Sequence, residues 1–302
     1  MDRLPYDVIV IGGSFAGLSA AMQLARARRR VLVIDAGRPR NRFSHAAHGF
    51  LGQDGRAPAA ILDEARAQLL AYPTADLVAG EAEHARQSDE GFAVTLASGE
   101  RVAASRLIIA TGVVDELPDL PGVRERWGVT VLHCPYCHGY EVAGGQLGVL
   151  ATDDMAIHQA LLIPDWGEVT LFTNGLPAPD AAQMAQLRAR GVRVETEPVA
   201  AVVGKTPALD AIKLRDGRIL PLDALFVASR TRLASPLAAQ LGCACDEGPF
   251  GPIIRTDPTK ETTVPGVFAA GDAARVPHNI TFASADGVMA GLAAHRALIS
   301  SQ

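Results

Sequence analysis

Residues 7–35, DVIVIGGSFAGLSAAMQLARARRRVLVID, constrain the fold more than any other part of the chain. An apolar run, a glycine turn, an Ala- and Leu-rich stretch and a second apolar run predict a strand, a helix over 15–28 and another strand. Gly12 permits the sharp turn, and Gly17 lets the helix pack closely on the strand. Asp35 follows about 20 residues later, where an acid binds a ribose hydroxyl. The segment predicts a dinucleotide-binding unit, and a strand–helix turn that binds nothing is the alternative.

The turn departs from the G-x-G-x-x-G pattern at one position, because Ser14 stands where the middle glycine is expected. Serine is small and can donate a hydrogen bond, so the departure is tolerable. The helix N-terminus would point its free N–H groups at a pyrophosphate. The expected cofactor contacts in this unit are Gly12, Gly13, Ser14, Phe15, Ala16, Gly17, Asp35 and Ala36.

Short runs rich in Val, Ile and Leu recur through the chain and alternate with Ala- and Leu-rich stretches. Near-continuous apolar runs are typical of parallel strands that are covered on both faces. Strands that alternate with helices predict an α/β fold of doubly wound, three-layer, Rossmann-like domains. The expected strands begin at Asp7, Val31, Leu107, Gln146, Glu168, Ala224 and Val267, and further helices are expected near 180–190 and 281–297.

The strand–helix–strand unit occurs twice, from Asp7 and from Gln146, which predicts two dinucleotide-type domains in 302 residues. Segment 114–133 contains Pro and Gly and is interpreted as a linker. Segment 243–252, also rich in Gly and Pro, is interpreted as the return crossing. We therefore expect a discontinuous first domain, 1–115 plus 246–302, and an inserted central domain, 116–245.

The composition limits the class of partner. The net charge is −5 and aromatic residues make up 5% of the chain, which disfavours nucleic acid, because its binders need a basic face and stacking side chains. No apolar run approaches the roughly 18 residues of a membrane span, and the N-terminus lacks the layout of a signal peptide. We therefore expect a soluble, cytoplasmic enzyme.

Two further strand ends favour a flavin dinucleotide over a nicotinamide at the first site. A carboxylate at the end of a buried strand is costly without a partner, and ribitol or ribose hydroxyls would satisfy it. A helix cap is the alternative role for the acid concerned, Asp272. The helix expected over 281–297 would direct its positive end toward the flavin pyrimidine. The strand ends are Ala110, Thr111 and Gly112 and, late in the chain, Gly271 and Asp272.

The four cysteines form two close pairs, Cys134 with Cys137 (C-x-x-C) and Cys243 with Cys245 (C-x-C). They are too few for a disulfide scaffold in a chain of this length. A cytosolic C-x-x-C is most often redox-active, and a helix that starts there would stabilise thiolates. A reduced buried pair and a zinc site from all four cysteines are alternatives. We favour the redox pair, expect no metal, and interpret the second pair as packing residues or exposed thiols.

These motifs together resemble the thioredoxin-reductase family over nearly the whole chain. The glycine turn, the ATG, the central C-x-x-C and TTVPGVFAAGDAA carry the resemblance. It implies an FAD domain made from both chain ends, a central NADPH domain and a dimer. It also implies a redox disulfide in which Cys137 faces the flavin and Cys134 meets the substrate. The stretch RNRFSHAAHGF would lie around the flavin, which adds Arg42, His48 and Gly49 as contacts.

The family commonly has an aspartate acid/base directly after the second cysteine, and this chain has His138 instead. Histidine titrates near neutrality, so it can take a thiol proton and return it. A helix-capping or core histidine is the alternative. Glu141 could orient His138 or pair with a thiol proton. His45 and His48 could merely pack or take a direct catalytic role, and His278 could contact the flavin or the thiols.

The second unit, QLGVLATDDMAIHQALLI, departs from the fingerprint that binds NADPH. Ala151 replaces the first glycine, and Asp153 places a carboxylate where a pyrophosphate should approach. Two unit charges about 4 Å apart repel by roughly 4 kcal/mol at an effective dielectric of about 20. That exceeds the roughly 1 kcal/mol of a helix dipole. Residues 172–175 also lack a basic group for the 2′-phosphate, so NAD(P)H binding is doubtful, with a rearranged binding loop as the alternative.

The chain resembles the thioredoxin-reductase-like dithiol oxidases, which form the disulfides of gliotoxin- or holomycin-type metabolites. The resemblance rests on CPYCHGYE, on SHAAHGF and on a second site that has lost the NADPH fingerprint. The resemblance implies FAD-dependent oxidation of a small-molecule or peptide dithiol through Cys134 and Cys137, with O₂ as acceptor. It implies a homodimer with no nucleic-acid or membrane partner. The alternatives are an NAD(P)H-dependent thioredoxin-disulfide reductase and a non-catalytic flavoprotein sensor or binding module.

Overall fold

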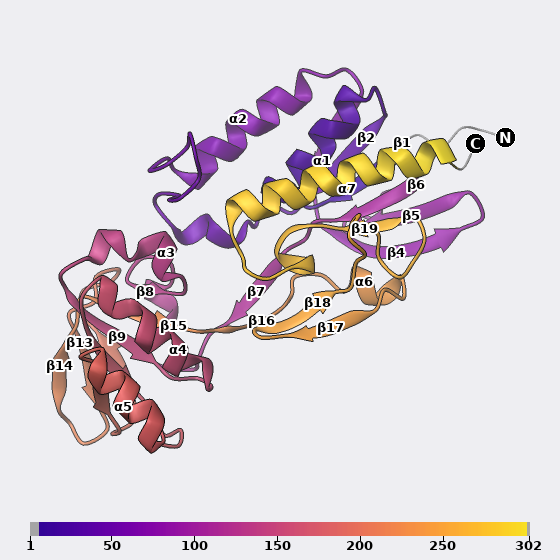
Figure 1. The fold of residues 1–302 in the computed structure, drawn as a ribbon. Helices are drawn as coiled ribbons and strands as arrows, with labels where there is room; N and C mark the ends of the chain where they lie inside the picture. Colours follow the sequence, from indigo (N-terminus) through magenta and orange to yellow (C-terminus); the bar gives the residue numbers. More distant parts are fainter. Residues whose placement is uncertain (1–5, 301–302) are drawn as a thin grey trace. The chain divides into compact units, whose positions relative to one another are not determined.

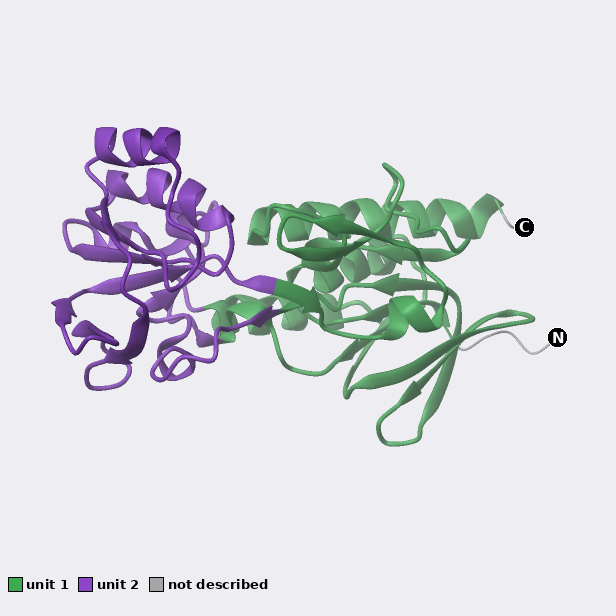
Figure 2. Ribbon diagram, turned by 90° about the horizontal axis from the view of Figure 1, so that it is seen from below, with its two compact units in different colours: residues 1–42, 58–114, 231–302 green, residues 43–57, 115–230 purple. Residues whose placement is uncertain are grey.

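The structure, a computed structural model, describes residues 6–300. These residues divide into two compact units, drawn in green and purple in Figure 2. Within the described residues, unit 1 comprises residues up to 42, residues 58–114 and residues from 231 onward, and unit 2 comprises 43–57 and 115–230. Each unit has its own sheet and its own apolar core.

Unit 1 is built on a seven-stranded sheet in the order β3-β2-β1-β6-β5-β4, in which β19 also pairs with β6 (Figure 1). Strands β1, β2, β3, β6 and β19 run parallel, whereas β4, β5 and β6 pair antiparallel. Alternate residues of the parallel strands enter two different cores, one on each face. The strands are β1 (Tyr6–Ile11), β2 (Val31–Asp35), β3 (Ala75–Ala79), β4 (Ala82–Ser88), β5 (Gly91–Leu96), β6 (Arg101–Ile109) and β19 (Val267–Ala269).

Helices α1 (Phe15–Arg26) and α7 (Ile280–Ser300) pack side by side on one face of this sheet (Figure 1). Their axes approach closely because α7 has glycine at two contact positions. A Cβ on Gly287 would lie 2.0 Å from the carbonyl oxygen of Ala16, and a Cβ on Gly291 would lie 2.6 Å from that of Ala20. Helix α2 (Pro58–Leu70) joins the same face, and α6 (Leu237–Gln240) packs in the core on the other face together with side chains of β4 and β5.

Unit 2 has a five-stranded parallel sheet in the order β11-β10-β9-β15-β8. Helices α4 and α5 cover one face, and a three-stranded antiparallel sheet, β12-β13-β14, covers the other. Helix α5 begins with a capping box between Asp180 and Gln183. The elements are β8 (Val131–Leu132), β9 (Gln146–Leu150), α4 (Met155–Leu162), β10 (Glu168–Phe172), α5 (Ala181–Ala189), β11 (Arg193–Glu195), β12 (Val199–Val203), β13 (Ala211–Leu214), β14 (Ile219–Pro221) and β15 (Ala224–Val227).

The remaining regular elements are short. Strands β7 and β16 pair with each other, and the chain passes between the units within them. Strands β17 and β18 form a hairpin, and a one-turn helix, α3, follows β8. These elements are β7 (Val113–Glu116), α3 (Pro135–His138), β16 (Arg230–Leu233), β17 (Cys245–Gly248) and β18 (Gly251–Ile254), with 3₁₀ turns η1 (Arg40–Phe43), η2 (Arg124–Arg126), η3 (Tyr140–Val142), η4 (Ile163–Asp165) and η5 (Gly271–Ala274).

The interpretation of segment 243–252 as the return crossing is wrong, because these residues belong to the β17–β18 hairpin of unit 1. Glycine and proline mark a two-residue hairpin turn as readily as a linker. The chain returns to unit 1 between Arg230 and Thr231 instead, earlier than the expected boundary at 245. Segment 43–57 also packs with unit 2, although it lies in the sequence between two parts of unit 1.

The α/β class and the Rossmann-type domains are confirmed, and each expected apolar run forms a strand. The predicted helices are present as α1, α5 and α7 with ends shifted by a few residues. The layers differ in one respect, since the second face of the unit 2 sheet is covered by antiparallel strands and not by helices. Between residues 6 and 300, no helix combines the length and the hydropathy that a membrane span requires.

Candidate active site

The glycine turn between β1 and α1 needs glycine at two positions. Gly12 has φ +112°, and a Cβ there would lie 2.3 Å from the carbonyl oxygen of Ala110. A Cβ on Gly17 would lie 1.8 Å from the carbonyl oxygen of Gly12, because α1 passes directly over the turn. The ATG that begins at Ala110, directly after β6, is thereby brought against the turn after β1.

The N-terminus of α1 has the features of an anion site. Ser14 is the N-cap residue, but its side chain makes no capping hydrogen bond, and the first turn has no acidic residue. A helix N-terminus of this kind, with no acidic side chain in its first turn, favours an anion such as a pyrophosphate. Ser14 has an extended backbone, with φ −98° and ψ −164°, so this position has no need of glycine. The departure from the G-x-G-x-x-G pattern is compatible with the fold.

Asp35 ends β2 and lies against the glycine turn, since a Cβ on Gly13 would come within 2.6 Å of its side chain. Its carboxylate accepts hydrogen bonds from the guanidinium of Arg66 at 2.9 Å and from the N–H of Gly37 at 3.1 Å. Ala36 follows and is exposed. Arg66 comes from α2 and orients the acid, a contact that the sequence analysis missed because nothing local marks it.

A second acid lies at the end of β19. Gly271 has φ +74°, and a Cβ there would lie 2.9 Å from the Cβ of Ala16 in α1. Asp272 pairs with Arg40 at 3.3 Å, and the same Arg40 Nη1 lies 2.6 Å from Nδ1 of His278. The acid at the end of this buried strand thus has a cationic partner, as burial requires.

The carboxyl ends of β1, β2, β6 and β19 meet at one edge of the unit 1 sheet, where dinucleotides bind in open α/β folds. The uncapped helix, the two glycines that cannot carry a Cβ, and the two acids fit FAD. Gly12 to Gly17 would hold the pyrophosphate, Asp35 the adenosine ribose, and Asp272 the ribitol. Gly112 adjoins this edge with φ +69°, and exposed Arg42 donates to the carbonyl of Pro39 at 2.9 Å.

The C-x-x-C lies in unit 2 at the start of α3. Cys134 is the N-cap residue with φ −109°, Pro135 opens the helix, and Cys137 N–H donates to the carbonyl of Cys134 at 3.3 Å. Both cysteines lie at partly buried positions. A helix does start at the C-x-x-C, but α3 has only four residues, so its dipole is small. Neighbouring side chains must therefore supply more of the control over thiol chemistry.

His138 is the last residue of α3 and Glu141 lies in η3, one turn later. Burial lowers the pKa of His138, the Glu141 carboxylate raises it, and the charge of His48 lowers it further. Nε2 of His48 lies 3.3 Å from Oε1 of Glu141. The structure thus brings together two residues that the sequence placed near the thiols, His138 and Glu141, with one that it placed at the flavin, His48.

Comparison with known proteins agrees with this geometry. The family model described as pyridine nucleotide-disulphide oxidoreductase matches residues 6–150 and 172–287. The chain is 34% identical to thioredoxin reductase tcpT of Claviceps purpurea (strain 20.1) over 97% of this chain and 94% of that protein. It is 30% identical to thioredoxin reductase sirT of Leptosphaeria maculans over 95% and 92%.

The chain belongs to the pyridine nucleotide-disulphide oxidoreductase family. Among solved structures, an oxidoreductase from Agrobacterium tumefaciens is 52% identical and superposes with a TM-score of 0.95, covering 99% of this chain and 100% of that one. HlmI is 40% identical with a TM-score of 0.91, over 98% and 93%. The protein is therefore a thioredoxin-reductase-like, flavin-dependent thiol–disulfide oxidoreductase, and FAD is its family cofactor.

NAD(P)H is the second cofactor of the pyridine nucleotide-disulphide oxidoreductases, but the residues at the second dinucleotide turn do not fit it. Ala151 is buried after β9, where the family fingerprint has glycine. Oδ1 of Asp153 accepts a hydrogen bond from the N–H of Met155 at 2.9 Å. The carboxylate thus occupies the N–H at the start of α4 that a pyrophosphate would need.

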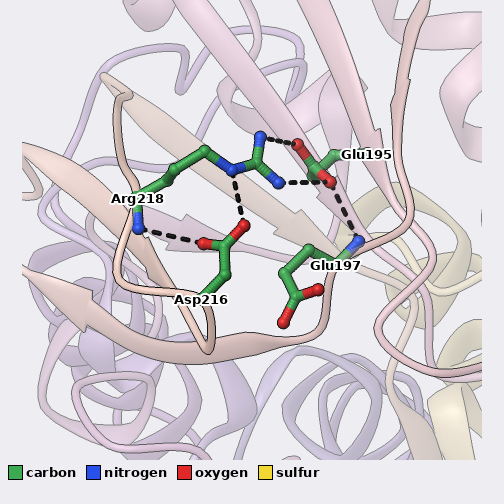
Figure 3. A network of polar contacts seen from close by, with 4 residues as sticks. All are labelled: Glu195, Glu197, Asp216 and Arg218. Carbon is green, nitrogen blue, oxygen red and sulfur yellow. Dashed lines mark hydrogen bonds and ion pairs between the residues drawn. The ribbon is translucent and has the colours of Figure 1, made fainter.

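The end of β10 is also unsuited to the 2′-phosphate of NADPH. Glu195 pairs with Phe172 in the sheet, and its carboxylate binds Arg218 at 2.7 and 3.1 Å (Figure 3). The hydrogen bond from Arg218 lowers the pKa of Glu195, and Arg218 also binds Asp216 at 2.6 Å. With Glu197 alongside, three carboxylates outnumber the one guanidinium, so this region repels a phosphate.

The second cysteine pair lies in unit 1. Cys243 is buried and donates to Oγ1 of Thr262 at 3.4 Å, and burial raises the pKa of its thiol. Cys245 is exposed on β17, and burial raises the pKa of that thiol too. Low thiolate content makes both poor nucleophiles. Among residues 6–300, no group of three or more His, Cys, Asp and Glu side chains is placed to hold a metal ion.

Proposed function

We propose that this chain oxidises a small-molecule or peptide dithiol to the disulfide, with dioxygen as the final electron acceptor. The observation that carries this direction is the hydrogen bond from Met155 N–H to Asp153, which closes the NAD(P)H turn with the protein's own carboxylate. A reductase needs that turn to take electrons from NADPH, whereas a dithiol oxidase does not. Bound FAD would accept two electrons from the cysteine pair and pass them to dioxygen.

The cysteine pair carries the exchange chemistry. One substrate thiolate attacks the sulfur of Cys134 in the Cys134–Cys137 disulfide, so that a mixed disulfide forms and Cys137 leaves as a thiolate. The second substrate thiolate attacks the substrate sulfur of the mixed disulfide and releases Cys134. The substrate has then lost two electrons and two protons, and the cysteine pair has gained both electrons. His138, neutral at pH 7 because burial lowers its pKa, accepts a thiol proton.

Two exposed tyrosines, one inside the C-x-x-C and one shortly after it, support a substrate with an apolar or aromatic body. Tyr136, 72% exposed, precedes Cys137, and Tyr140, 84% exposed, follows His138. Tyr136 is braced by an edge-on contact with Trp166, with ring centroids 5.6 Å apart. Rigid aromatic side chains bind apolar ligands at a small cost in conformational entropy.

A homodimer and a cytoplasmic location are part of the proposal. Helix α7 has a row of half-exposed apolar residues along one side, at the spacing of successive helical turns, which would suit a second copy of the chain. A reducing compartment would supply free dithiols as substrate. The row consists of Phe282, Met289, Leu292 and Ile299.

Oxygen consumption tests the direction of catalysis. Flavin-loaded protein is mixed with dithiothreitol in air, and oxygen uptake, hydrogen peroxide and oxidised dithiothreitol are measured together. We expect one O₂ consumed and one H₂O₂ formed for each dithiol oxidised. If the protein instead reduces a disulfide substrate at micromolar NADPH and leaves dithiothreitol unoxidised in air, it is a reductase and the proposal is wrong.

A further inference from the structure

Segment 47–56 of unit 2 forms a loop that is bonded to itself. Ala47 is buried and pairs with Arg56 in an antiparallel bridge, in which Ala47 N–H donates to the Arg56 carbonyl at 2.8 Å. Gly55 N–H donates back to the Ala47 carbonyl at 2.9 Å. His48, the next residue, is therefore carried on a fixed frame and not on a free loop tip.

His48 lies between two carboxylates. Its Nδ1 is 3.6 Å from Oδ1 of Asp54, and its Nε2 is 3.3 Å from Oε1 of Glu141. Asp54 is itself held by the N–H of Gly49 at 2.8 Å. The side chain of His48 is only 23% exposed, so water screens the contact with Glu141 incompletely. The loop is thereby connected to η3, the element that directly follows the C-x-x-C helix.

The pKa of His138 depends on both residues of this pair, His48 and Glu141. The Glu141 carboxylate raises the pKa of His138 and the charge of His48 lowers it, while burial sets the overall decrease. The other titratable groups of α3 and η3 are Cys137, on the same turn, and the exposed Tyr136 and Tyr140, and Asp54 stands behind His48. Removing Glu141 should therefore lower the pKa of His138, and removing His48 should raise it.

We propose that His48 is a positioning residue for the thiol chemistry of Cys134 and Cys137, because its contact with the Glu141 carboxylate offsets the charge that Glu141 presents to His138. The inference rests on the dithiol oxidation proposed above and adds no redox step. The proton still passes between a substrate or cysteine thiol and His138. His48 acts through Glu141 and fixes the charge that His138 faces.

Substitutions on both sides of the pair test this role. His48→Ala removes the contact with Glu141 and the interaction with His48 that lowers the pKa of His138, so the titration midpoint of His138 should rise by at least about 0.3 pH unit. Glu141→Gln should lower the midpoint. Dithiol-dependent flavin reduction should slow about tenfold in His48→Ala. His48→Gln, which can still donate to Glu141, should restore the rate to within about twofold of the wild type.

The midpoints are read by NMR titration of the His138 ring signal, which needs no turnover, and the rates by stopped-flow absorbance over the same pH range. His84→Ala is the control, because His84 is an exposed histidine on β4 of unit 1, outside the stretch assigned to the flavin. It should change neither readout. Flavin content and thermal unfolding of each variant identify those that fail to fold. Glu141→Gln is a second variant that removes the other charge of the His48–Glu141 pair.

The role of His48 is overturned if His48→Ala behaves like His84→Ala, if His48→Ala and Glu141→Gln move the midpoint in the same direction, or if His48→Gln is as slow as His48→Ala. Failure of the proposed function is distinguishable from this. If the wild-type protein does not oxidise dithiols, opposite midpoint shifts in the NMR titration still establish the His48–Glu141 pair.

Discussion

The carboxylate of Asp153 accepts a hydrogen bond from the backbone N–H of Met155, 2.9 Å away, at the start of α4. In a dinucleotide site the phosphate takes such an N–H group. Here the protein satisfies it with a fixed negative charge, and Ala151 fills the place of the turn glycine. Two properties of one turn therefore depart from the fingerprint that binds NADPH.

Removing the carboxylate should restore part of the lost affinity. Asp153→Gly eliminates a repulsion of roughly 4 kcal/mol at about 4 Å and an effective dielectric of about 20, so NADPH should bind at least tenfold tighter. Dithiol oxidation should stay within twofold of the wild type. Reductase turnover should not appear, because residues 173–175 supply no basic group. Equilibrium titration with NADPH measures the affinity, and an unchanged Kd would show that Asp153 is not the block.

A single methyl group should abolish flavin binding. In Gly17→Ala the new Cβ would lie 1.8 Å from the carbonyl oxygen of Gly12, so the turn must move away from the pyrophosphate position. We expect the flavin-to-protein ratio to fall at least tenfold. Gly80→Ala is the matched control, since its Cβ would meet only the flexible end of Leu96 at 3.2 Å. Full flavin content in Gly17→Ala would disprove the assignment of this turn.

The two central cysteines should fail in different ways. Cys134→Ser leaves Cys137 as a lone thiol, which should give a long-wavelength absorption band with oxidised flavin and no turnover. Cys137→Ser leaves Cys134 able to capture a thiol reagent, but no electrons should reach the flavin. Each variant is titrated with dithiol and followed at the flavin and long-wavelength bands. Wild-type dithiol oxidation by Cys137→Ser would exclude the disulfide as the electron relay.

His138 should control the acid side of the pH profile. Burial lowers its pKa below the usual histidine value of about 6.5, so the wild-type rate should be full at pH 7 and fall as the pH drops through the lowered pKa. His138→Ala should slow dithiol-dependent flavin reduction by about 10²–10⁴-fold. The loss should be smallest at high pH, where substrate thiols ionise unaided.

The same shift has a consequence for stability. The unfolded chain binds the His138 proton more readily than the folded chain, so this contribution is full above about pH 6.5 and is lost as the pH falls through the folded-state pKa. Thermal unfolding of the wild type and His138→Ala between pH 5 and 8 measures it. The role of His138 in catalysis is contradicted if the rate of dithiol-dependent flavin reduction falls with acid pH in the same way in the wild type and in His138→Ala.

The parallel strands could be predicted from the sequence because burial on both faces demands continuous apolar runs, as in β1 and β2. The antiparallel covering strands could not. Strand β4 reads AEHARQS, and only two of its residues are buried, so it has no strong pattern. The Gly- and Pro-rich segment 243–252 was misinterpreted because hairpin turns and linkers use the same residues.

The residues of the site divide in the same way. Gly12, Gly17 and the C-x-x-C follow from local chemistry, since a tight turn and a reactive thiol pair each require particular residues at fixed spacing. The contact of Arg66 with Asp35, by contrast, joins residues 31 positions apart. That of Arg40 with Asp272 joins residues 232 positions apart. Such partners depend on how separate elements pack, which no local pattern encodes.

Anaerobic stopped-flow reduction of the flavin tests the central claim most directly, because it compares the two electron donors on one protein. The flavin-loaded wild type is mixed in separate experiments with dithiothreitol and with NADPH, and bleaching of the flavin band is followed. We expect dithiothreitol to bleach the flavin through Cys134 and Cys137, and NADPH to react slowly, without saturation up to millimolar concentration. Fast bleaching that saturates at micromolar NADPH would contradict the closed turn at Asp153 and make the protein a reductase.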